Sequence, residues 1–289
     1  MDVTQQTDHQ QTTLWNGLGG HTWVEAQELL DQMFKPFEDL LVIAVSARNS
    51  RGPILDVGCG TGSTTLAVAR VPGARGSTGI DISEPMIAKA RVRAAQERTL
   101  ATFIRADAQT HVFEPASFDM IISRFGVMFF DEFVAAFENL RRAARNSAEL
   151  RFLAWRAPEE NPFTMTAERA AAPLLPELPV RRPDEPGQFA FADARRVHHI
   201  LERSGWAEAD IRPIDVACTL PETELVRYFT TLGPVGRILH DVDERTRAQV
   251  IETLRAAFDP YVQGAEVRFT AACWMVSARA SSAPPTIPK

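Results

Sequence analysis

Cysteine is scarce in this chain of 289 residues. The three that occur, Cys59, Cys218 and Cys273, are far apart, odd in number and outside any zinc-type spacing. Such a set builds neither a disulfide framework nor a zinc site, and it is typical of free thiols in a reducing compartment. We therefore expect a cytoplasmic protein with no structural disulfide and no metal.

Long apolar runs and an excess of basic charge are also missing. No stretch of about eighteen apolar residues occurs, so no membrane span is expected. The opening MDVTQQTDHQQTT lacks a basic start followed by an apolar core, so no secretory signal is expected. The formal net charge is -6, whereas surfaces that bind nucleic acid are normally basic. A nucleic-acid partner is not expected, although charge alone leaves room for a local basic patch.

The composition that is present, 45% apolar and 24% charged, is that of a soluble globular protein. From Pro53 onward, segments with the pattern of strands alternate with segments of helical periodicity. This alternation predicts parallel βαβ units in a doubly wound α/β sheet. The expected strands are 54–58, 76–83, 101–108, 117–126, 148–156, 209–220 and 266–279.

Helices are expected before the sheet and within its last third. Apolar residues at helical spacing over 23–45 indicate one or two helices broken at Pro36. The proline-rich segment 157–190 is too long for an ordinary loop and indicates a binding lid with a short helix at 164–172. The expected parts are a helical cap (1–48), a cofactor-binding core (49–156), the lid (157–190), the rest of the core (191–279) with inserted helices (222–258), and a disordered tail (280–289).

The stretch ILDVGCGTGS, from Ile54 to Ser63, places three glycines between the first strand and the first helix of the sheet. Glycines let the chain turn sharply there and let a ligand lie against bare backbone. A dinucleotide fingerprint needs G-x-G-x-x-G, but the third glycine comes one position early, and no lysine follows as in a P-loop. The loop therefore predicts a ligand site that matches neither of these phosphate-binding motifs.

Acidic residues end the next two strands. Asp81 closes the second strand 25 positions after Asp56, where a ribose diol is bound in such folds, and Asp107 closes the third. All three strand ends lie at the carboxyl edge of the sheet, where open α/β sheets bind ligands. One ligand could therefore touch all of them.

Together these motifs resemble the class I S-adenosylmethionine-dependent methyltransferases, in the small-molecule group that includes the ubiquinone and menaquinone biosynthesis type. The resemblance rests on ILDVGCGTG, GIDIS, RADA, FDMIISRFGVMFF and RFLAWR, and it covers about residues 15 to 279 in order. It implies a Rossmann-like, mostly parallel seven-stranded sheet with N-terminal helices and a helical lid. It also implies S-adenosylmethionine as the cofactor and S-adenosylhomocysteine as its product.

The resemblance implies which residues hold this cofactor. The glycine loop would approach the methionine part, Asp81 would accept hydrogen bonds from both ribose hydroxyls, and Asp107 with the amide of Ala108 would read the adenine edge. Asp56 and Asp81 could instead be helix caps or surface carboxylates, and Asp107 a plain strand-end residue. The expected set is Asp56, Gly58, Cys59, Gly60, Gly62, Asp81, Ile82, Met86, Asp107, Ala108 and Ser123.

One segment departs from the family pattern. Where the family often has a Pro-Gly-Gly turn before the fifth strand, this chain reads RNSAEL, from Arg145 to Leu150. Asn146 can still supply a turn with positive φ. The departure therefore concerns the strand boundary and not the cofactor site.

The sequence indicates less clearly which residues would bind the methyl acceptor, the molecule that receives the methyl group. Arg124 could face the cofactor or substrate, or could pair with Asp131 or Glu132. His21 is a candidate base, although a surface or cap role competes with that. Aromatic residues in segments near the site indicate an apolar acceptor, although the same residues could be core. The expected pocket residues are Trp23, Phe125, Phe163 and His240, with Trp15, Phe129 and Phe189 in neighbouring segments.

The sequence therefore predicts methyl transfer from S-adenosylmethionine to oxygen or carbon of a small, aromatic or apolar acceptor. The transfer would be an in-line displacement without metal, by a monomer or homodimer. Two alternatives stay open. One is a methyltransferase that acts on tRNA or protein, and the other is a non-catalytic S-adenosylmethionine-binding protein.

Overall fold

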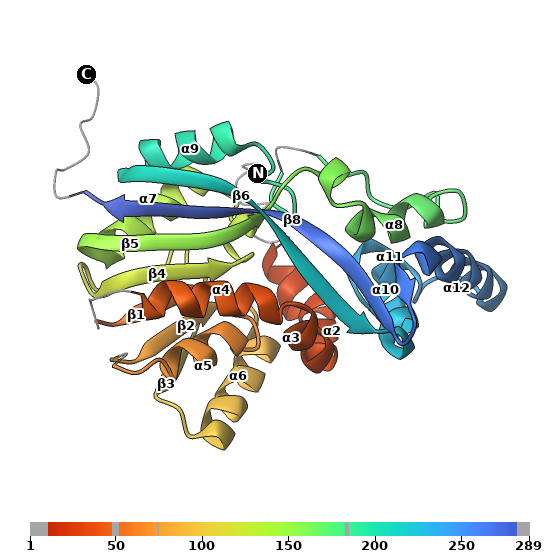
Figure 1. The fold of residues 1–289 in the computed structure, drawn as a ribbon, viewed down its shortest axis with the longest axis horizontal. Helices are drawn as coiled ribbons and strands as arrows, with labels where there is room; N and C mark the ends of the chain where they lie inside the picture. The colour runs from red at the N-terminus through yellow and green to blue at the C-terminus, as the bar shows by residue number, and fades with distance from the viewer. Residues whose placement is uncertain (1–10, 48–51, 74, 183–184, 282–289) are drawn as a thin grey trace.

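The computed structural model describes residues 11–47, 52–73, 75–182 and 185–281. At its centre, Figure 1 shows one mixed sheet with the strand order β3-β2-β1-β4-β5-β8-β6. Strands β3, β2, β1, β4 and β5 are parallel, and β8 runs antiparallel to both β5 and β6. The bounds are β1 Ile54–Val57, β2 Ser77–Asp81, β3 Ala101–Arg105, β4 Phe118–Arg124, β5 Ala144–Trp155, β6 Trp206–Pro221, β7 Val262–Gln263 and β8 Glu266–Ala280.

The predicted α/β fold with a mostly parallel sheet is confirmed. Seven strands form the continuous order, and the two-residue β7, which the sequence did not indicate, pairs with β8 beside them. The strand order reverses at β1, because β2 pairs with one edge of β1 and β4 pairs with the other. In doubly wound sheets a ligand binds at such a switch point, outside the carboxyl ends of the strands.

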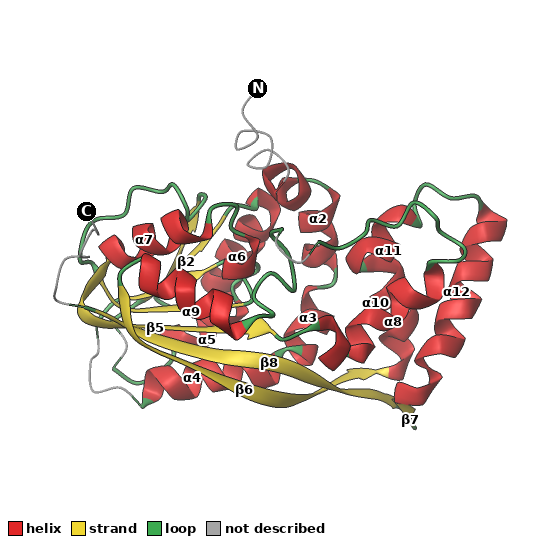
Figure 2. Ribbon diagram, turned by 90° about the horizontal axis from the view of Figure 1, so that it is seen from above, coloured by secondary structure: helices red, strands yellow, loops and turns green. Residues whose placement is uncertain are grey.

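Helices cover both faces of the sheet. Figure 2 shows α4 on one face and α7 and α9 on the other. The central strands are therefore buried on both sides and consist of apolar residues such as Leu55, Ile122 and Phe152, each 0% exposed. The helix bounds are α2 Leu18–Glu25, α3 Gln27–Met33, α4 Lys35–Ser46, α5 Ser63–Ala69, α6 Glu84–Glu97, α7 Phe133–Ala143, α8 Pro162–Ala171, α9 Ala194–Arg203, α10 Leu225–Thr231, α11 Gly233–Ile238 and α12 Glu244–Phe258.

The segment before the sheet differs in detail from the expectation. Residues 11–16 are helical, and three further helices, α2 to α4, follow in the described part and meet at Ala26 and Phe34. Pro36 does not break a helix but lies in the first turn of α4. Its missing N–H costs nothing there, because the first-turn amides of a helix have no intrahelical partner.

The turn before β5 also differs. Ser147, with φ 65°, takes the left-handed conformation that the sequence assigned to Asn146. Strand β5 already begins at Ala144, and its pairing with β4 is interrupted between Phe118 and Met120. The residues of β5 between its two paired stretches therefore form a bulge within the strand pair and not a separate loop.

Strands β6 and β8 extend well beyond the parallel part of the sheet as an antiparallel ribbon (Figure 1). Helices α8, α10, α11 and α12 lie together beside the far end of this ribbon (Figure 2). Within the expected lid, the helix begins at Pro162, two residues earlier than predicted. Ala280, the first residue of the expected tail, ends β8, and residues 282–289 lie outside the described part of the chain.

Candidate active site

A cavity opens at the carboxyl edge of β1, β2 and β4, under the N-terminal helices. It holds about 1080 Å³ of empty space, including its open mouth. One side is formed by the glycine loop and the ends of β2 and β3, and the other by aromatic residues of the N-terminal helices and of the segment after β4. The sheet edge predicted to bind a ligand thus lies against the cap.

The glycine loop has the backbone that its sequence predicts. Gly58, Gly60 and Gly62 have φ values of 66°, 54° and 88°, in the left-handed region that glycine tolerates best. Gly58 also packs on the segment after β4, since a Cβ atom there would lie 2.5 Å from the Cα atom of Gly126. Gly62 does not line the cavity but forms the N-cap of α5.

Asp81 is held at the end of β2 by two backbone amides. One carboxylate oxygen accepts a hydrogen bond from the N–H of Gly60 (2.8 Å), and the other accepts one from Ser83 (2.9 Å). Burial raises the pKa of Asp81, and these amide bonds oppose that shift. Each carboxylate oxygen can accept a second bond, so the group can still bind a pair of hydroxyls.

The end of β3 is fixed by a residue that the sequence did not single out. Gln109 donates its backbone and side-chain N–H groups to Asp107. Its side-chain oxygen accepts hydrogen bonds from the amides of Asp131 and Glu132. Gln109 therefore ties the loop after β3 to the start of α7, and no local pattern marks it for this role.

Asp56 lies beneath the cavity wall and does not line it. Its carboxylate is 1% exposed and accepts a hydrogen bond from the hydroxyl of Thr65 at 2.6 Å, which ties β1 to α5. Burial raises its pKa from 3.8 to about 7. The structure therefore places Asp56 in the support of the glycine loop and not in the ligand wall.

The raised pKa of Asp56 gives stability a pH dependence. The folded chain holds the proton of the Asp56 carboxyl more tightly than the unfolded chain does. The contribution of Asp56 to the free energy of unfolding therefore falls as pH rises from 3.8 to about 7. Asp56→Asn should therefore gain about 1–3 kcal/mol relative to wild type between about pH 4 and about pH 8. Urea unfolding at both pH values measures it, with exposed Glu28→Gln as control. A constant difference between variant and wild type would contradict the assignment.

Comparison with known proteins agrees with this geometry. Residues 54–147 match the family model described as a methyltransferase domain. An uncharacterized Mycobacterium tuberculosis protein is 29% identical over 130 residues, and the match covers 44% of this chain but only 45% of that protein. The demethylmenaquinone methyltransferase of Staphylococcus haemolyticus is 25% identical over 167 residues, covering 55% of this chain and 70% of that enzyme.

Among solved structures, phosphoethanolamine N-methyltransferase 2 of Haemonchus contortus, in complex with S-adenosylmethionine, has a TM-score of 0.58. It is 16% identical and covers 93% of this chain and 59% of that chain, so the likeness shows a shared fold. Residues 54–147 therefore carry a methyltransferase domain.

Most of the expected cofactor residues of this methyltransferase domain lie around the cavity. Those that line it are Gly58, Cys59, Gly60, Asp81, Ile82, Met86, Asp107 and Ala108, whereas Asp56, Gly62 and Ser123 do not. The hydroxyl of Ser123 donates to the carbonyl of Val57 (2.7 Å) and accepts from the amides of Gly126 and Val127. Ser123 therefore joins β4 to β1 and has no capacity left for a ligand.

The expected acceptor-side residues divide in the same way. Trp23, Phe125 and Arg124 line the cavity, and Trp15 and Phe129 lie beside them. His21 and His240 are exposed and do not line it, and the Nδ1 atom of His21 lies 3.0 Å from the carbonyl of Gly17. Phe163 is buried elsewhere, stacked on Phe269 at 3.8 Å between ring centroids, because α8 packs against α12.

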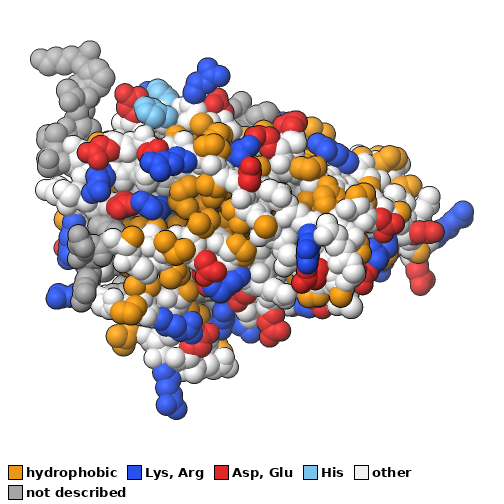
Figure 3. All heavy atoms as spheres, in the orientation of Figure 1, with side chains coloured by type: hydrophobic (Ala, Val, Ile, Leu, Met, Phe, Trp, Pro, Cys, Tyr) orange, Lys and Arg blue, Asp and Glu red, His pale blue; other side chains and the backbone are white. Residues whose placement is uncertain are grey.

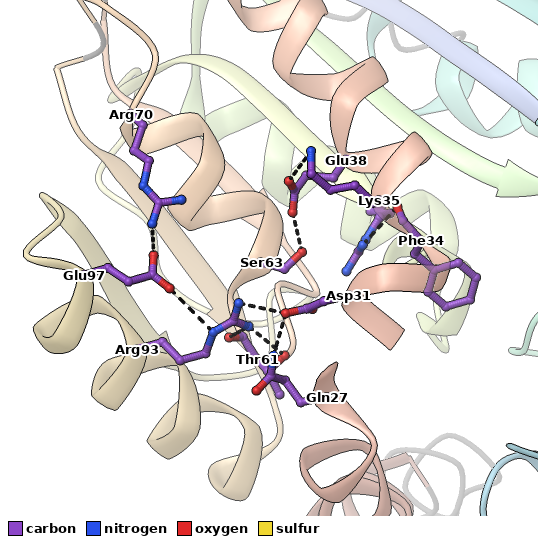
Figure 4. Close-up of polar contacts among 11 residues, drawn as sticks. Gln27, Asp31, Phe34, Lys35, Glu38, Thr61, Ser63, Arg70, Arg93 and Glu97 are labelled. Carbon is purple, nitrogen blue, oxygen red and sulfur yellow. Dashed lines mark hydrogen bonds and ion pairs between the residues drawn. The ribbon is translucent and has the colours of Figure 1, made fainter. Parts of the chain in front are cut away.

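An ionic network fastens the cap to the glycine loop (Figure 4). Arg93 on α6 pairs with Asp31 on α3 at 2.8 Å and donates to the carbonyl of Thr61 at 2.9 Å. Glu38 on α4 accepts a hydrogen bond from Ser63 at the start of α5, at 2.6 Å. The sequence did not indicate these residues, because their partners lie 25 or more positions away.

Arg93→Ala is expected to release α3 from the glycine loop. Losing the partly buried pair should cost about 1–3 kcal/mol locally, which corresponds to roughly tenfold or faster hydrogen exchange of the amides in 27–33 and 57–61. Arg145→Ala is the matched control, because Arg145 pairs with Asp119 at the start of β4, away from the cavity and from Arg93. Unchanged protection of α3 in Arg93→Ala would show that the pair does not hold the cap.

Proposed function

We propose that this protein transfers a methyl group from S-adenosylmethionine to oxygen or carbon of a small aromatic or apolar acceptor. The observation that carries the proposal is the cavity itself, since one continuous space joins the glycine loop, Asp81 and Asp107 to an aromatic wall. The cofactor would occupy the first part and the acceptor the second.

The charge of the cavity favours a cationic cofactor over a phosphate-bearing one. Among the described residues, its wall carries four carboxylates against the guanidinium of Arg124; the carboxylates belong to Asp31, Asp81, Asp107 and Asp131. A pyrophosphate would be repelled by such a wall, whereas S-adenosylmethionine carries a sulfonium and an ammonium against one carboxylate. The charge of the wall therefore supports S-adenosylmethionine over a phosphate-bearing cofactor, as the spacing of the glycines also does.

The aromatic wall supports a planar or apolar acceptor. The ring of Trp15 meets those of Trp23 and Phe129 edge to face, at 5.7 Å and 5.4 Å between centroids. On the other side Phe125 stacks on Trp155 at 4.9 Å. Aromatic walls of this kind suit aromatic ligands, and the quinone-related names of the relatives point to the same class.

Methyl transfer from a sulfonium requires mainly that the acceptor atom is aligned with the methyl group and that water is excluded. The cofactor supplies an activated methyl group, and positioning can contribute roughly 7–11 kcal/mol to such a reaction. The loop from Gly58 to Thr61 would orient the methionine part, Asp81 would fix the ribose and Asp107 the adenine. Trp15, Trp23 and Phe129 would keep water from the reacting atoms.

We assign the lid role to segments 157–190 and 222–258 together. Helix α8 of the first segment packs on α11 and α12 of the second. Arg227 on α10 donates to the carbonyl of Glu25 in α2 at 2.6 Å, so the inserted helices reach the cap that covers the cavity. Closure over the acceptor would involve both parts.

Two other functions are less well supported. On the face seen in Figure 3, acidic and basic side chains are interspersed and do not form a basic stripe of the kind that binds tRNA. A non-catalytic S-adenosylmethionine-binding protein would share the same cofactor motifs. No helix in the described ranges is long and apolar enough to cross a membrane.

The experiment that tests the proposal is an acceptor screen with release of S-adenosylhomocysteine as readout. Phenolic, quinol and amine acceptors are compared, with transfer RNA and a denatured protein extract as macromolecular arms. Turnover of a phenol or quinol is the expected result. Turnover of a macromolecule alone, or of no acceptor by a chain that binds the cofactor, would overturn the proposal.

A further inference from the structure

Arg124, the last residue of β4, brings a positive charge to the aromatic side of the cavity. Among the described lining residues it is the single Lys, Arg or His. Its guanidinium lies over the ring of Phe34, 5.8 Å from the centroid, and one N–H donates weakly to the carbonyl of Phe34 at 3.5 Å. A guanidinium has five donors, and among the described residues the carbonyl of Phe34 is the one acceptor that Arg124 meets.

The carboxylates around Arg124 are already bonded to other groups. Asp31, Glu38 and Asp56 stabilise its charge through space. However, Asp31 accepts from Gln27 and Arg93, and Glu38 accepts from Ser63 and pairs with Lys35. Asp56 accepts from Thr65. These acids make a buried cation tolerable without consuming its donors.

The backbone after Arg124 is held in an unfavourable conformation. Phe125 has φ 66°, which costs a bulky side chain roughly 1–2 kcal/mol. Its ring stacks on Trp155 and meets Phe37 at 4.9 Å, and its amide donates to Leu153 at 3.2 Å. Strain of this kind persists where packing overrides it and is concentrated at functional sites. It fixes the end of β4, which carries the guanidinium.

Burial lowers the pKa of Arg124, so binding an anion would restore the solvation that the guanidinium has lost. No histidine lines the described cavity wall. Of its carboxylates, Asp81 and Asp107 would face the cofactor, Asp31 is bonded to Gln27 and Arg93, and Asp131 is the remaining one. An adjacent guanidinium makes a side-chain base unnecessary, because it lowers the pKa of a bound hydroxyl and lets the proton leave to solvent.

We propose that Arg124 binds a deprotonated oxygen of the methyl acceptor and so selects aromatic acceptors with an ionisable hydroxyl. This role rests on the proposed methyl transfer. In the reaction the electron pair of the phenolate or its conjugated ring carbon forms a bond to the methyl carbon, and the carbon–sulfur bond breaks with its pair left on sulfur. The negative charge of the acceptor and the positive charge of the sulfonium disappear together. When the ring carbon attacks, its hydrogen is afterwards lost as a proton to solvent and the oxygen takes up a proton, which restores the aromatic ring.

The test uses the full chain saturated with S-adenosylhomocysteine and three probes that differ in charge. Para-nitrophenol reports its own ionisation by absorbance, para-nitroanisole is its neutral methyl ether, and para-nitrobenzoate is an anion of a different class. We expect the bound phenol to ionise at a lower pH than the free phenol. We also expect the phenolate to bind more tightly than the ether and the benzoate.

Arg124→Gln should weaken phenolate binding at least about tenfold, equivalent to about 1.4 kcal/mol, and abolish the shift in its ionisation, while the ether binds as before. Arg124→Lys should restore part of both effects, because it keeps the charge but not the fork of donors. An equal loss for phenolate and ether would indicate a structural role and overturn the proposal. Tighter binding of the benzoate would overturn the choice of hydroxyl.

The wild type alone decides the case if both variants fail to fold. A folded wild type that binds S-adenosylhomocysteine but leaves the ionisation of para-nitrophenol unshifted would refute the role of Arg124 and leave the cofactor assignment intact. A folded wild type that does not bind S-adenosylhomocysteine would refute the proposed function itself. The two failures are thus distinguishable in one set of titrations.

Discussion

Asp81→Ala should lower the affinity for S-adenosylhomocysteine roughly a hundredfold, a loss of about 3 kcal/mol. The proposed contacts are two hydrogen bonds from ribose hydroxyls to one charged carboxylate. That carboxylate is held in place by the amides of Gly60 and Ser83. Calorimetric titration of wild type and variant measures the loss directly.

Because Asp81 also organises the loop, the folded state of the variant must be measured as well. Asp81→Asn keeps the shape and one accepting oxygen, so it should bind with intermediate affinity. Both variants should retain the circular dichroism and cooperative unfolding of the wild type. Wild-type affinity in a folded Asp81→Ala variant would show that the cofactor does not contact the end of β2.

Gly126→Ala should damage the same site from the opposite side. A Cβ atom on Gly126 would lie 2.5 Å from the carbonyl oxygen of Val57 and 2.7 Å from the Cα atom of Gly58. Gly126 itself has ordinary helical angles, with φ -77° and ψ -41°, so the effect is purely steric. Backbone atoms cannot rotate away, so the glycine loop must shift, at a cost of about 1–3 kcal/mol in stability and more than about tenfold in cofactor affinity.

Gly264→Ala is the matched control for this prediction. Nothing lies within 4 Å of a Cβ atom there, but the residue has φ 64°. It should therefore lose about 1 kcal/mol of stability through backbone strain alone and bind the cofactor normally. Similar effects of both variants on cofactor affinity would mean that contact between Gly58 and Gly126 does not shape the site.

The sequence predicts well those features that depend on residues close together in the chain. The order of strands and helices, the glycine loop and the acid that ends β2 each depend on neighbours within a few residues. The same local pattern could not separate Asp56 from Asp81. Asp56 lies within β1, where its side chain points under α5, whereas Asp81 is the last residue of β2 and reaches past the sheet edge.

The missed residues depend on how helices pack. Asp31 and Arg93 meet only because α3 and α6 come together beside Thr61 of the glycine loop, a contact between positions far apart in the chain. Phe163 shows the converse error. Its place in a proline-rich segment indicated the pocket, but α8 packs against α12 and β8, where Phe163 joins a separate aromatic cluster with Phe258 and Phe269. Neither outcome leaves a signal in periodicity or composition.

The bonds between cap and core have a thermodynamic consequence. Arg93 with Asp31, Ser63 with Glu38, and Ser83 with the carbonyl of Trp15 together fasten the cap through groups of the chain itself. The conformational entropy lost in ordering Trp15, Trp23 and Phe34 is therefore lost during folding and not again at each binding event. A preorganised wall of this kind holds small ligands tightly for the number of contacts they make, and it makes opening of the cap a separate step from the methyl transfer.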